Sequence, residues 1–455
     1  MLADKLRDLL GDERVLRDKE ELLCYSYDAT LKEFFPDIVV FPLTTGEISK
    51  IVKLCLSYNN TPLVGRGSGS GFSGGSLPLN KGVVVSFTKM NRILELDEEN
   101  MLVTVEPGIL NGDLKTFLSE KGYFYPPDPA SYEFSTIGGN VAECAGGPGA
   151  VKYGVTKNYV ESLEIVTGTG EIITTGSKTV KDVAGYNLTQ LLVGSEGTLG
   201  LFSKITLRFI PKPEANSLIF VSFNDINEGY MAALSLLRHK NKPSMLEFMD
   251  KSSIDAVKNY FKSDIIDFKG AFVFIIEADG TKSEVETSIK DYENILKKYS
   301  PVFLFSSSKD SEKDAIMGAR RAISPSLRKY GDLKINNDIA VPVNKITGML
   351  SFINQTSSRY NIPIINFGHF GDGNIHVNIM LYKSDLEMVE RGERAKTDIL
   401  RKTVELGGSI SGEHGIGILK KEFMGLKYSN YYMDLLKGVK KVFDPYSILN
   451  PGKIF

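Results

Sequence analysis

The feature of this sequence that most restricts its fold is a glycine-rich loop. Residues 62 to 79 read PLVGRGSGSGFSGGSLPL, contain no acidic side chain, and lead directly into a β-rich run, GVVVSF. Such a composition is ordinarily that of a flexible linker, but linkers seldom join two strands so closely. Glycines allow successive backbone N–H groups to converge on an anion, and Arg66 adds positive charge. We therefore predict a phosphate-binding loop.

The loop also contains a GxGxG pattern, which occurs in nicotinamide-binding folds. In those folds the glycines must open a helix. Here Pro78 and a strand follow the glycines instead. The context therefore predicts a pyrophosphate site in a different fold.

Composition narrows the class of protein. A chain of 455 residues predicts two or three packed units, and a net charge of −2 argues against nucleic acid as a partner. Three isolated cysteines, Cys24, Cys55 and Cys144, indicate a reducing compartment and exclude an iron–sulfur cluster bound by this chain alone. No apolar run reaches the roughly eighteen residues of a membrane span, and the N-terminus lacks the apolar core of a signal peptide. We expect a cytoplasmic protein.

The expected strands and helices change their rhythm near residue 212. Short β-rich runs alternate with glycine-rich turns from residue 37 to about 210, and one helix, with Thr44 or Thr45 as its N-cap, follows the first strand. After IPKPEAN, residues 210 to 216, strand candidates alternate with longer helical patterns. This alternation predicts an α+β layer with helices on one face of an antiparallel sheet.

Several long motifs follow the glycine loop in a distinctive order. They are YPPDPASYEFSTIGGNVAECAGG, DVAGYNLTQLLVGSEGTLG and the C-terminal DPYSILNPGKIF. Together they resemble the glycolate oxidase and D-lactate dehydrogenase flavoproteins, which have the vanillyl-alcohol oxidase (PCMH-type) fold. The resemblance implies an α+β protein with four parts. These are an N-terminal helical segment (1–35), a PCMH-type FAD-binding domain (36–214), an α+β substrate or cap domain (215–410) and a C-terminal helical segment (411–455) that returns to the flavin.

The same resemblance assigns residues to FAD. Some relatives attach FAD covalently through a histidine in the glycine loop, and this loop has none, so non-covalent FAD is implied. The assigned residues are Arg66, Gly67, Ser68, Gly69, Ser70, Gly71, Gly74, Gly75, Pro127, Asp128, Ser131, Thr136, Gly138, Gly139, Asn140, Gly146, Gly147, Glu196, Gly197 and Ile205.

Two of the four histidines lie in NFGHFGDGNIHVNIM, residues 366 to 380. A turn centred on Asp372-Gly373 predicts a two-residue hairpin in which His369 faces His376. Opposed side chains lie on one face of a sheet with Cβ atoms about 5 Å apart. Both imidazoles can therefore reach one metal ion at about 2.1 Å. Asn378 follows on the same face.

The remaining acidic candidate is SGEHGIG, residues 411 to 417. Adjacent residues cannot easily share one face, so we expect Glu413 as a third metal ligand and His414 as a free base. The resemblance agrees, since HxGDGNxH followed by GEHG is similar to the divalent-metal site of the family, with His369, His376 and Glu413 as ligands and His414 as catalytic base. Two histidines, one carboxylate and open positions suit Zn²⁺, Mn²⁺ or Fe²⁺.

A 2-hydroxy acid offers such a metal its carboxylate and its hydroxyl group. Coordination lowers the pKa of the hydroxyl, His414 takes the proton, and a hydride leaves Cα for flavin N5. The segment ARRAISPS, residues 319 to 326, matches the arginine motif of the family. Arg320, assisted by Ser324, is therefore expected to bind the substrate carboxylate. An exposed helix arginine is the alternative.

The substrate and the electron acceptor are less constrained. Relatives that act on D-2-hydroxyglutarate bind its distal carboxylate through a lysine. Lys334 lies two residues further from the shared proline, which favours D-lactate or glycolate. Reduced flavin requires an acceptor outside this chain, namely an iron–sulfur partner subunit, an electron-transfer flavoprotein, a quinone or a cytochrome. Any association with a membrane is expected through such a partner.

Two rival functions belong to other classes. A metallohydrolase could use the same His, His and Glu, but it leaves the glycine loop unexplained. A catalytically inactive FAD-binding subunit would be expected to have lost the metal ligands or His414, and both are intact.

Overall fold

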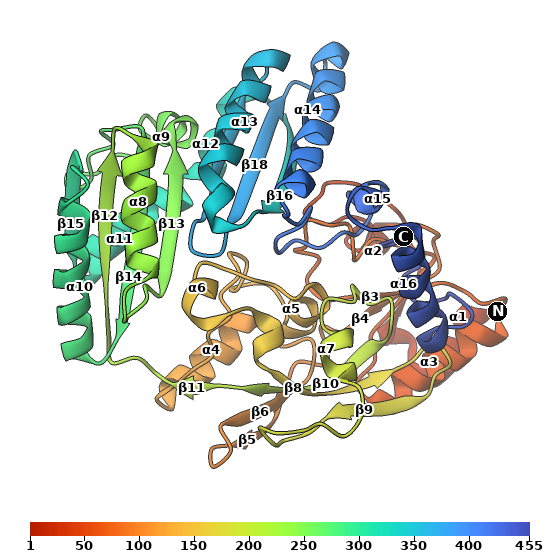
Figure 1. Ribbon diagram of the computed structural model, residues 1–455. Helices are drawn as coiled ribbons and strands as arrows, with labels where there is room; N and C mark the ends of the chain where they lie inside the picture. The colour runs from red at the N-terminus through yellow and green to blue at the C-terminus, as the bar shows by residue number, and fades with distance from the viewer. The chain divides into compact units, whose positions relative to one another are not determined.

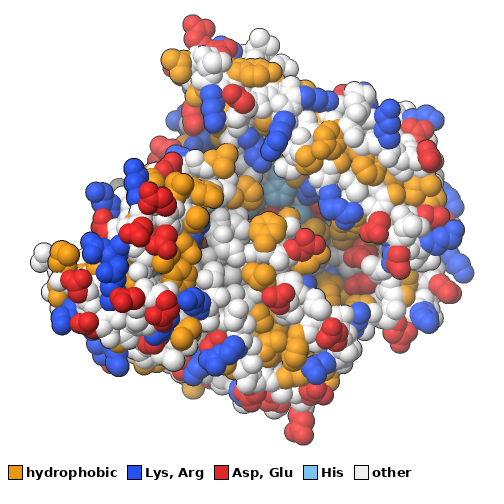
Figure 2. All heavy atoms as spheres, turned by 180° about the vertical axis from the view of Figure 1, so that it is seen from behind, with side chains coloured by type: hydrophobic (Ala, Val, Ile, Leu, Met, Phe, Trp, Pro, Cys, Tyr) orange, Lys and Arg blue, Asp and Glu red, His pale blue; other side chains and the backbone are white.

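The computed structural model describes residues 1–455, which divide into two compact units. The first comprises Met1–Gly146, Val155–Lys212 and Glu413–Phe455, and the second comprises Gly147–Gly154 and Pro213–Gly412. No helix combines the length and the apolar character needed to cross a bilayer. Acidic and basic side chains are interspersed over the surface seen in Figure 2.

A four-stranded sheet opens the first unit, in the order β1 (Val15–Leu16), β2 (Ile38–Val40), β4 (Val83–Ser86), β3 (Leu63–Arg66). The last three strands run parallel, and α3 (Thr45–Ser57) connects β2 to β3. Thr44 caps this helix by accepting a hydrogen bond from the Glu47 backbone N–H, which confirms one of the two predicted start positions. The glycine loop leaves the end of β3 and returns to β4, as predicted.

The second sheet of this unit is antiparallel, in the order β5 (Ile93–Asp97), β6 (Leu102–Val105), β10 (Leu201–Arg208), β8 (Val160–Val166), β9 (Ile172–Gly176). A short pair, β7 (Tyr123–Phe124) and β11 (Ile210–Pro211), lies outside it. The remaining helices of the unit are α1 (Leu2–Leu10), α2 (Lys19–Leu23), α4 (Asn111–Glu120), α5 (Ile137–Glu143), α7 (Leu188–Leu192), α15 (Met424–Lys427) and α16 (Asn430–Phe443).

One antiparallel sheet of seven strands forms the centre of the second unit. Its order is β15 (Phe303–Ser307), β12 (Ala215–Phe223), β14 (Phe272–Gly280), β13 (Met245–Asp250), β17 (Ile364–His369), β18 (Asn374–Leu381), β16 (Leu333–Ala340). Its helices are α6 (Ala150–Tyr153), α8 (Ile226–Leu237), α9 (Lys251–Val257), α10 (Lys282–Lys297), α11 (Asp310–Arg321), α12 (Ile323–Ser326), α13 (Ile346–Tyr360) and α14 (Leu386–Glu405).

The prediction of helices on a single face of this sheet is wrong. One face packs on α8, α10, α13 and α14, while α9, α11 and α12 contribute Ile254, Ile316 and Ile323 to an apolar cluster with Phe220 and Ile275 on the opposite face (Figure 1). The strands are accordingly buried on both sides, so their sequences are nearly continuous apolar runs. Such runs do not reveal which face a helix covers.

The histidine hairpin differs from its predicted register. His369 pairs with Asn374, and His376 pairs with Phe367, so the connection is a four-residue loop, Phe370 to Gly373, instead of a two-residue turn. The shift amounts to two residues, and side chains alternate with a period of two. Both histidines and Asn378 therefore remain on one face, as the sequence predicted.

Candidate functional site

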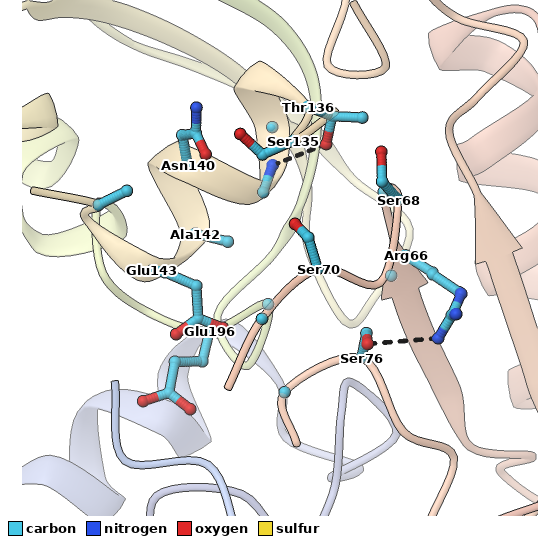
Figure 3. Close-up of a pocket in the computed structure, with 18 of the residues that line it drawn as sticks. Arg66, Ser68, Ser70, Ser76, Ser135, Thr136, Asn140, Ala142, Glu143 and Glu196 are labelled. Atoms are coloured by element: carbon cyan, nitrogen blue, oxygen red, sulfur yellow. Dashed lines mark hydrogen bonds between the residues drawn. The ribbon is translucent and has the colours of Figure 1, made fainter. Parts of the chain in front are cut away.

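A cavity with a mouth open to solvent lies within the first unit, and its empty space, including the open mouth, amounts to about 1240 Å³. Its walls come from the glycine loop after β3, the start of α5, the turn before β10 and the segment carrying Glu413 and His414 (Figure 3). Segments distant in sequence are therefore gathered around one space. The predicted FAD residues that line it are Arg66, Gly67, Ser68, Gly69, Ser70, Gly71, Gly75, Ser131, Thr136, Gly138, Gly139, Asn140, Gly146, Glu196 and Gly197.

Close packing explains why glycine is required at Gly67 in this loop and at Gly138 in α5. A Cβ on Gly67 would lie 2.1 Å from Oγ1 of Thr136, which caps α5 through the Gly139 N–H. A Cβ on Gly138 would lie 2.6 Å from Cβ of Pro107. By contrast, nothing lies within 4 Å of a Cβ at Gly71, so that position is open. The loop is thus a shaped wall of the cavity.

Arg66 lines the cavity, and hydrogen bonds to other residues hold its guanidinium in place. Its Nη2 donates to the backbone oxygen of Tyr27 at 2.7 Å, and Nη1 donates to Oγ of Ser76 at 3.3 Å (Figure 3). The guanidinium also lies directly against Gly69, where a Cβ would be 2.3 Å from Nη2. Arg66 therefore fixes the loop and places a positive charge beside its backbone N–H groups.

Three polar atoms of the cavity wall are buried and have no hydrogen-bond partner in the protein. They are Oγ of Ser135, Nδ2 of Asn140 and Oε2 of Glu143. Buried polar groups normally have partners, so these atoms favour a polar ligand in the cavity. A flavin dinucleotide, with its ring amides, hydroxyls and phosphates, fits a wall that combines them with a glycine cradle. Sequence reasoning missed Ser135 and Glu143, although Ser135 opens the STIGGN motif and Glu143 follows it by three residues.

Glu143, which is half-buried, and Glu196, which is buried, are acids at the same end of the cavity (Figure 3). Burial raises the pKa of both carboxyl groups, and the proximity of Glu196 raises the pKa of Glu143 further. The Glu196 carboxylate accepts hydrogen bonds from the backbone N–H groups of Ile416 and Gly417, both at 2.7 Å. Glu196 therefore holds the loop that carries His414.

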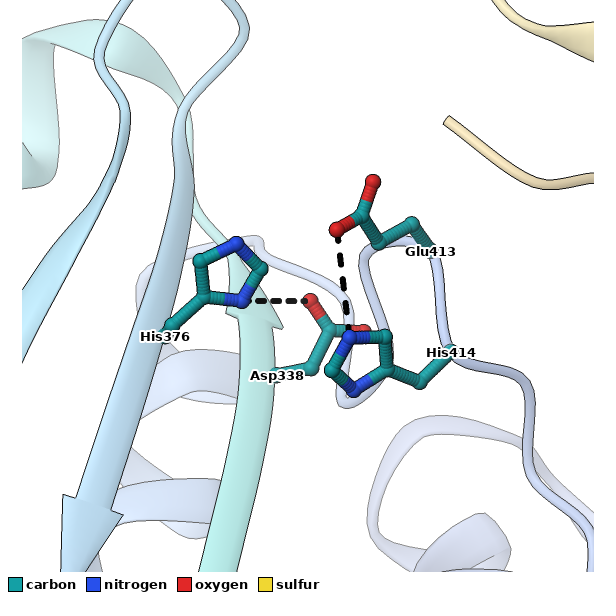
Figure 4. Close-up of side chains that lie close together, drawn as sticks. All are labelled: Asp338, His376, Glu413 and His414. Carbon is teal, nitrogen blue, oxygen red and sulfur yellow. Dashed lines mark ion pairs between the residues drawn. The ribbon is translucent and has the colours of Figure 1, made fainter. Parts of the chain in front are cut away.

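Glu413 and His414 line the same cavity as the glycine loop. Nε2 of His414 lies 3.8 Å from Oε1 of Glu413, an arrangement shown in Figure 4. The imidazole packs on Phe72 of the glycine loop, with ring centroids 5.2 Å apart, and Oε2 of Glu413 occupies the space that a Cβ on Gly146 would need. An imidazole thus faces the space assigned to the flavin.

The second unit brings His369 and His376 together. Their Nε2 atoms lie 3.3 Å apart, and both side chains are buried. Two nitrogens bound to one metal at about 2.1 Å are separated by roughly 3.0–3.4 Å. The spacing therefore fits a shared ion.

Two buried carboxylates that the sequence analysis missed face the other nitrogen of each ring. Nδ1 of His369 contacts Oε1 of Glu247, and Nδ1 of His376 lies 3.9 Å from Oδ1 of Asp338 (Figure 4). A carboxylate behind a metal-binding histidine is the usual means of orienting it. Glu247 interrupts an apolar run, MLEFM, and this was the available signal for it, whereas Asp338 lies in a strand with further polar residues, LKINNDIA.

Asp338 also binds the first residue of the GEHG motif. Its carboxylate accepts hydrogen bonds from Nδ2 of Asn374 at 2.6 Å and from the Gly412 N–H at 2.9 Å. A Cβ on Gly412 would lie 2.0 Å from that same Nδ2 atom. The hairpin and the start of the motif are thus tied together within the second unit.

Arg320 lies near the end of α11 and is mostly buried, with 17% of its side chain exposed, whereas Arg321 is exposed. Its Nε donates to Oε2 of Glu247 at 2.6 Å, and its Cζ lies 4.4 Å from the ring centroid of Phe367. Burial by itself raises the pKa of Glu247, but His369 and Arg320 lower it to about 2. The guanidinium therefore lies beside the histidine pair.

The other residues that the sequence associates with the substrate are Asn378, Ser324 and Lys334. Nδ2 of Asn378 donates to the backbone oxygens of Ile365 and His376, both at 3.2 Å. Ser324 is exposed on α12. Lys334 is on the same face of β16 as Asp338 but four residues away along the strand, and burial lowers its pKa.

Several residues assigned to FAD do not line the cavity. Gly74, within the glycine loop, packs against Ile418. The backbone oxygen of Pro127 accepts a hydrogen bond from Asn111. Asp128 interacts electrostatically with Lys115. Ile205 is fully buried in the five-stranded sheet, between Val105 and Leu163. Gly147 belongs to the second unit.

Two family models match the chain. The model for the FAD binding domain matches residues 36–176, and the model for the C-terminal domain of FAD linked oxidases matches residues 212–454. The chain is 40% identical to the glycolate oxidase subunit GlcD of Bacillus subtilis, over 100% of this chain and 96% of the relative. It is 33% identical to a D-lactate dehydrogenase of Anaerostipes hadrus, over 92% of this chain and 89% of the relative.

A third relative is the D-2-hydroxyglutarate dehydrogenase of Stutzerimonas stutzeri, 31% identical over 100% of this chain and 98% of the relative. Among solved structures, p-cresol methylhydroxylase superposes with a TM-score of 0.82 at 18% identity, over 100% of this chain and 96% of that one. Alkyldihydroxyacetonephosphate synthase superposes with a TM-score of 0.77 at 21% identity, over 99% and 84%. These two establish the fold, which is the predicted PCMH-type α+β class.

Proposed function

The chain belongs to the FAD-linked oxidase family, and we propose that it oxidises a short D-2-hydroxy acid, D-lactate or glycolate, to the 2-oxo acid. The observation that carries the proposal is the presence of His414 in the wall of the cavity that the glycine loop also lines. This position supports His414 as a base that acts beside a bound flavin ring. Relatives named for both substrates cover nearly the whole chain.

We assign to His414 the role of accepting the proton of the substrate hydroxyl. A neutral imidazole has a nitrogen lone pair that can accept that proton, the usual role of histidine as a general base. Phe72 and the loop held by Glu196 support the position of the ring. When bound, FAD supplies the acceptor for the hydride of Cα. The glycine loop and Arg66 would hold its pyrophosphate, without a covalent bond.

We assign a divalent metal to His369, His376 and Glu413. The separation of 3.3 Å between the two Nε2 atoms and the carboxylate behind each ring support the histidines as ligands. Glu413 rests on the family motif. When bound, the ion lowers the pKa of the substrate hydroxyl. Zn²⁺, Mn²⁺ and Fe²⁺ remain alternatives, because all three accept two imidazoles and a carboxylate.

Arg320 is proposed to bind the substrate carboxylate. Its guanidinium is mostly buried, so its pairing with a carboxylate is only weakly screened by water. Asn378, on the same sheet face, and Ser324 are proposed as lesser contributors. A longer substrate, D-2-hydroxyglutarate, is the alternative, with Lys334 as the residue for its distal carboxylate. The two-residue offset of Lys334 from the shared proline in the sequence favours the shorter acids.

Electrons must leave the flavin through an external acceptor. An iron–sulfur partner subunit is our first choice and an electron-transfer flavoprotein our second. The relatives named as subunits of glycolate oxidase support an assembly with further chains. A cytoplasmic location, with membrane association only through a partner, completes the proposal.

A direct test mixes the purified protein anaerobically with D- and L-lactate, glycolate and D-2-hydroxyglutarate while flavin absorbance is followed. We expect a yellow protein whose absorbance near 450 nm is bleached fastest by D-lactate or glycolate. Fastest bleaching by D-2-hydroxyglutarate would establish the longer substrate instead. A colourless protein that cleaves an ester or peptide would establish a metallohydrolase.

A further inference from the structure

Glu247 divides its carboxylate between two groups that the proposed function uses separately. Oε1 contacts Nδ1 of His369, and Oε2 accepts the Nε–H of Arg320 at 2.6 Å. We propose that Glu247 is a positioning residue that orients the metal-binding imidazole and the carboxylate-binding guanidinium at the same time. This inference rests on the proposed function and adds to it a physical link between metal binding and substrate binding.

The sheet itself dictates the contact with the imidazole. Glu247 on β13 is the direct partner of His369 on β17, so both side chains leave the same face of the sheet as neighbours. Glu247 is completely buried within the apolar strand MLEFMD. A buried carboxylate is costly unless it is paired and hydrogen-bonded. His369 and Arg320 supply one partner for each of the two carboxylate oxygens of Glu247.

The carboxylate selects one tautomer of His369. An ionised carboxylate can only accept hydrogen bonds, so Nδ1 of His369 must carry the proton. Nε2 of a neutral ring then keeps its lone pair, and it is the atom that lies 3.3 Å from Nε2 of His376. The lone pair is thereby available for a metal ion in the direction that the second histidine also faces.

The same carboxylate sets the orientation of Arg320. Arg320 donates its Nε–H to Glu247, and its Cζ lies 4.4 Å from the centroid of the Phe367 ring. The Nη1–Nη2 edge of the guanidinium is left without a protein hydrogen-bond acceptor. That edge carries four N–H groups. A substrate carboxylate can approach it in the end-on, bidentate manner, whereas the side-on approach through Nε is blocked by Glu247.

Substitution by glutamine separates these roles from a purely steric one. Glutamine has the shape of glutamate, but it has one acceptor oxygen and an amide that only donates. Its single acceptor oxygen can bind either His369 or Arg320, and its amide N–H groups then face the other donor. Aspartate has a poorer shape and shorter reach, yet it keeps two acceptor oxygens. If Glu247 positions its two partners, Glu247→Gln should weaken metal and substrate binding more than Glu247→Asp. If Glu247 only fills space, the reverse order is expected.

The experiment measures Zn²⁺ affinity by chelator competition, KM and kcat for D-lactate at saturating Zn²⁺, and flavin content. For Glu247→Gln we expect metal binding weaker by about 10–100-fold and a KM raised by roughly tenfold or more, with kcat changed less and flavin content unaltered. Glu247→Asp should lie between this variant and the wild type. The matched control is Glu277→Gln, because Glu277 lies on the same sheet face and bonds only to Asn216 and Ser244. It should behave as wild type.

Wild-type metal affinity and KM in Glu247→Gln would overturn the inference, as would a Gln variant closer to wild type than the Asp variant. If the Gln variant does not fold, Glu247→Asp is compared with the wild type instead. An unchanged metal affinity and an unchanged KM in the Asp variant would also overturn the inference. Failure of the proposed function has a different signature. The wild-type flavin would then not be bleached by any 2-hydroxy acid, although the metal affinities could still be compared.

Discussion

Nε2 of His369 and Nε2 of His376 lie 3.3 Å apart, although the two residues are not partners in the hairpin that they share. His369 pairs with Asn374 and His376 with Phe367, so the rings meet diagonally across two strands on one face. This arrangement depends on alternation along each strand and tolerates a shift in register of two residues. It is the geometric basis of the proposed metal site.

Replacing His376 by alanine is expected to abolish turnover and metal binding while flavin remains bound. All residues that line the flavin cavity lie in the other unit of the chain. Metal content by mass spectrometry and flavin absorbance check the two halves of this expectation. The matched control is His239→Ala, because His239 pairs with Asp291 and is remote from the hairpin in sequence. Full activity after removal of the metal by a chelator would contradict the assignment.

Replacing His414 by alanine should leave flavin and metal in place but slow the bleaching of flavin by substrate. General-base catalysis contributes roughly 10²–10⁴-fold, and the loss is expected in that range. Anaerobic stopped-flow absorbance measures the rate directly. Bleaching at the wild-type rate would remove His414 from the role of base.

Replacing Arg320 by alanine should raise KM for short 2-hydroxy acids. Loss of a charge-assisted pair costs about 1.5–3 kcal/mol, which corresponds to roughly 10–100-fold. Arg321→Ala is the matched control, because Arg321 is exposed and donates only to the Asp314 backbone oxygen. Steady-state kinetics of both variants decide whether Arg320 is the residue that binds the carboxylate. An unchanged KM in the Arg320 variant would assign that role elsewhere.

Replacing Gly67 by alanine should abolish flavin binding. The added Cβ would lie 2.1 Å from Thr136 Oγ1, a distance that forces the loop or the start of α5 to move. Gly71→Ala is the control within the same loop, because its Cβ would meet no atom within 4 Å. The ratio of flavin to protein after purification distinguishes the two. Equal flavin content in both variants would contradict the loop geometry.

The pH dependence of stability should contain a contribution from Lys115. Burial lowers its pKa to about 8, although Asp128 opposes the shift. Between pH 8 and about 10.4, the ordinary lysine pKa, the unfolded chain binds more protons than the folded one, so this residue makes stability rise with pH. Lys115→Met should reduce that rise by about 1–3 kcal/mol. Urea unfolding at pH 8 and pH 10 measures it, and identical rises in both proteins would contradict the shift.

Local sequence alone determined the position of the glycine loop between two strands, the common face of the two histidines and the family. A glycine loop between strands constrains its backbone locally, and alternation with a period of two assigns faces without knowledge of the partner strand. The predicted α+β fold and the resemblance to FAD-linked oxidases are confirmed. The metal ligands and the base remain proposals.

Only the tertiary structure decided which groups stand behind the histidines and the arginine. Glu247 is 122 residues from His369 and 73 from Arg320 in sequence. Its contacts arise because β13 pairs with β17 and α11 packs over that face, and neither pairing is encoded within a single segment. Long-range partners such as these are set by the packing of whole elements. The same reason explains why helices on both faces of the seven-stranded sheet escaped a reading based on local periodicity.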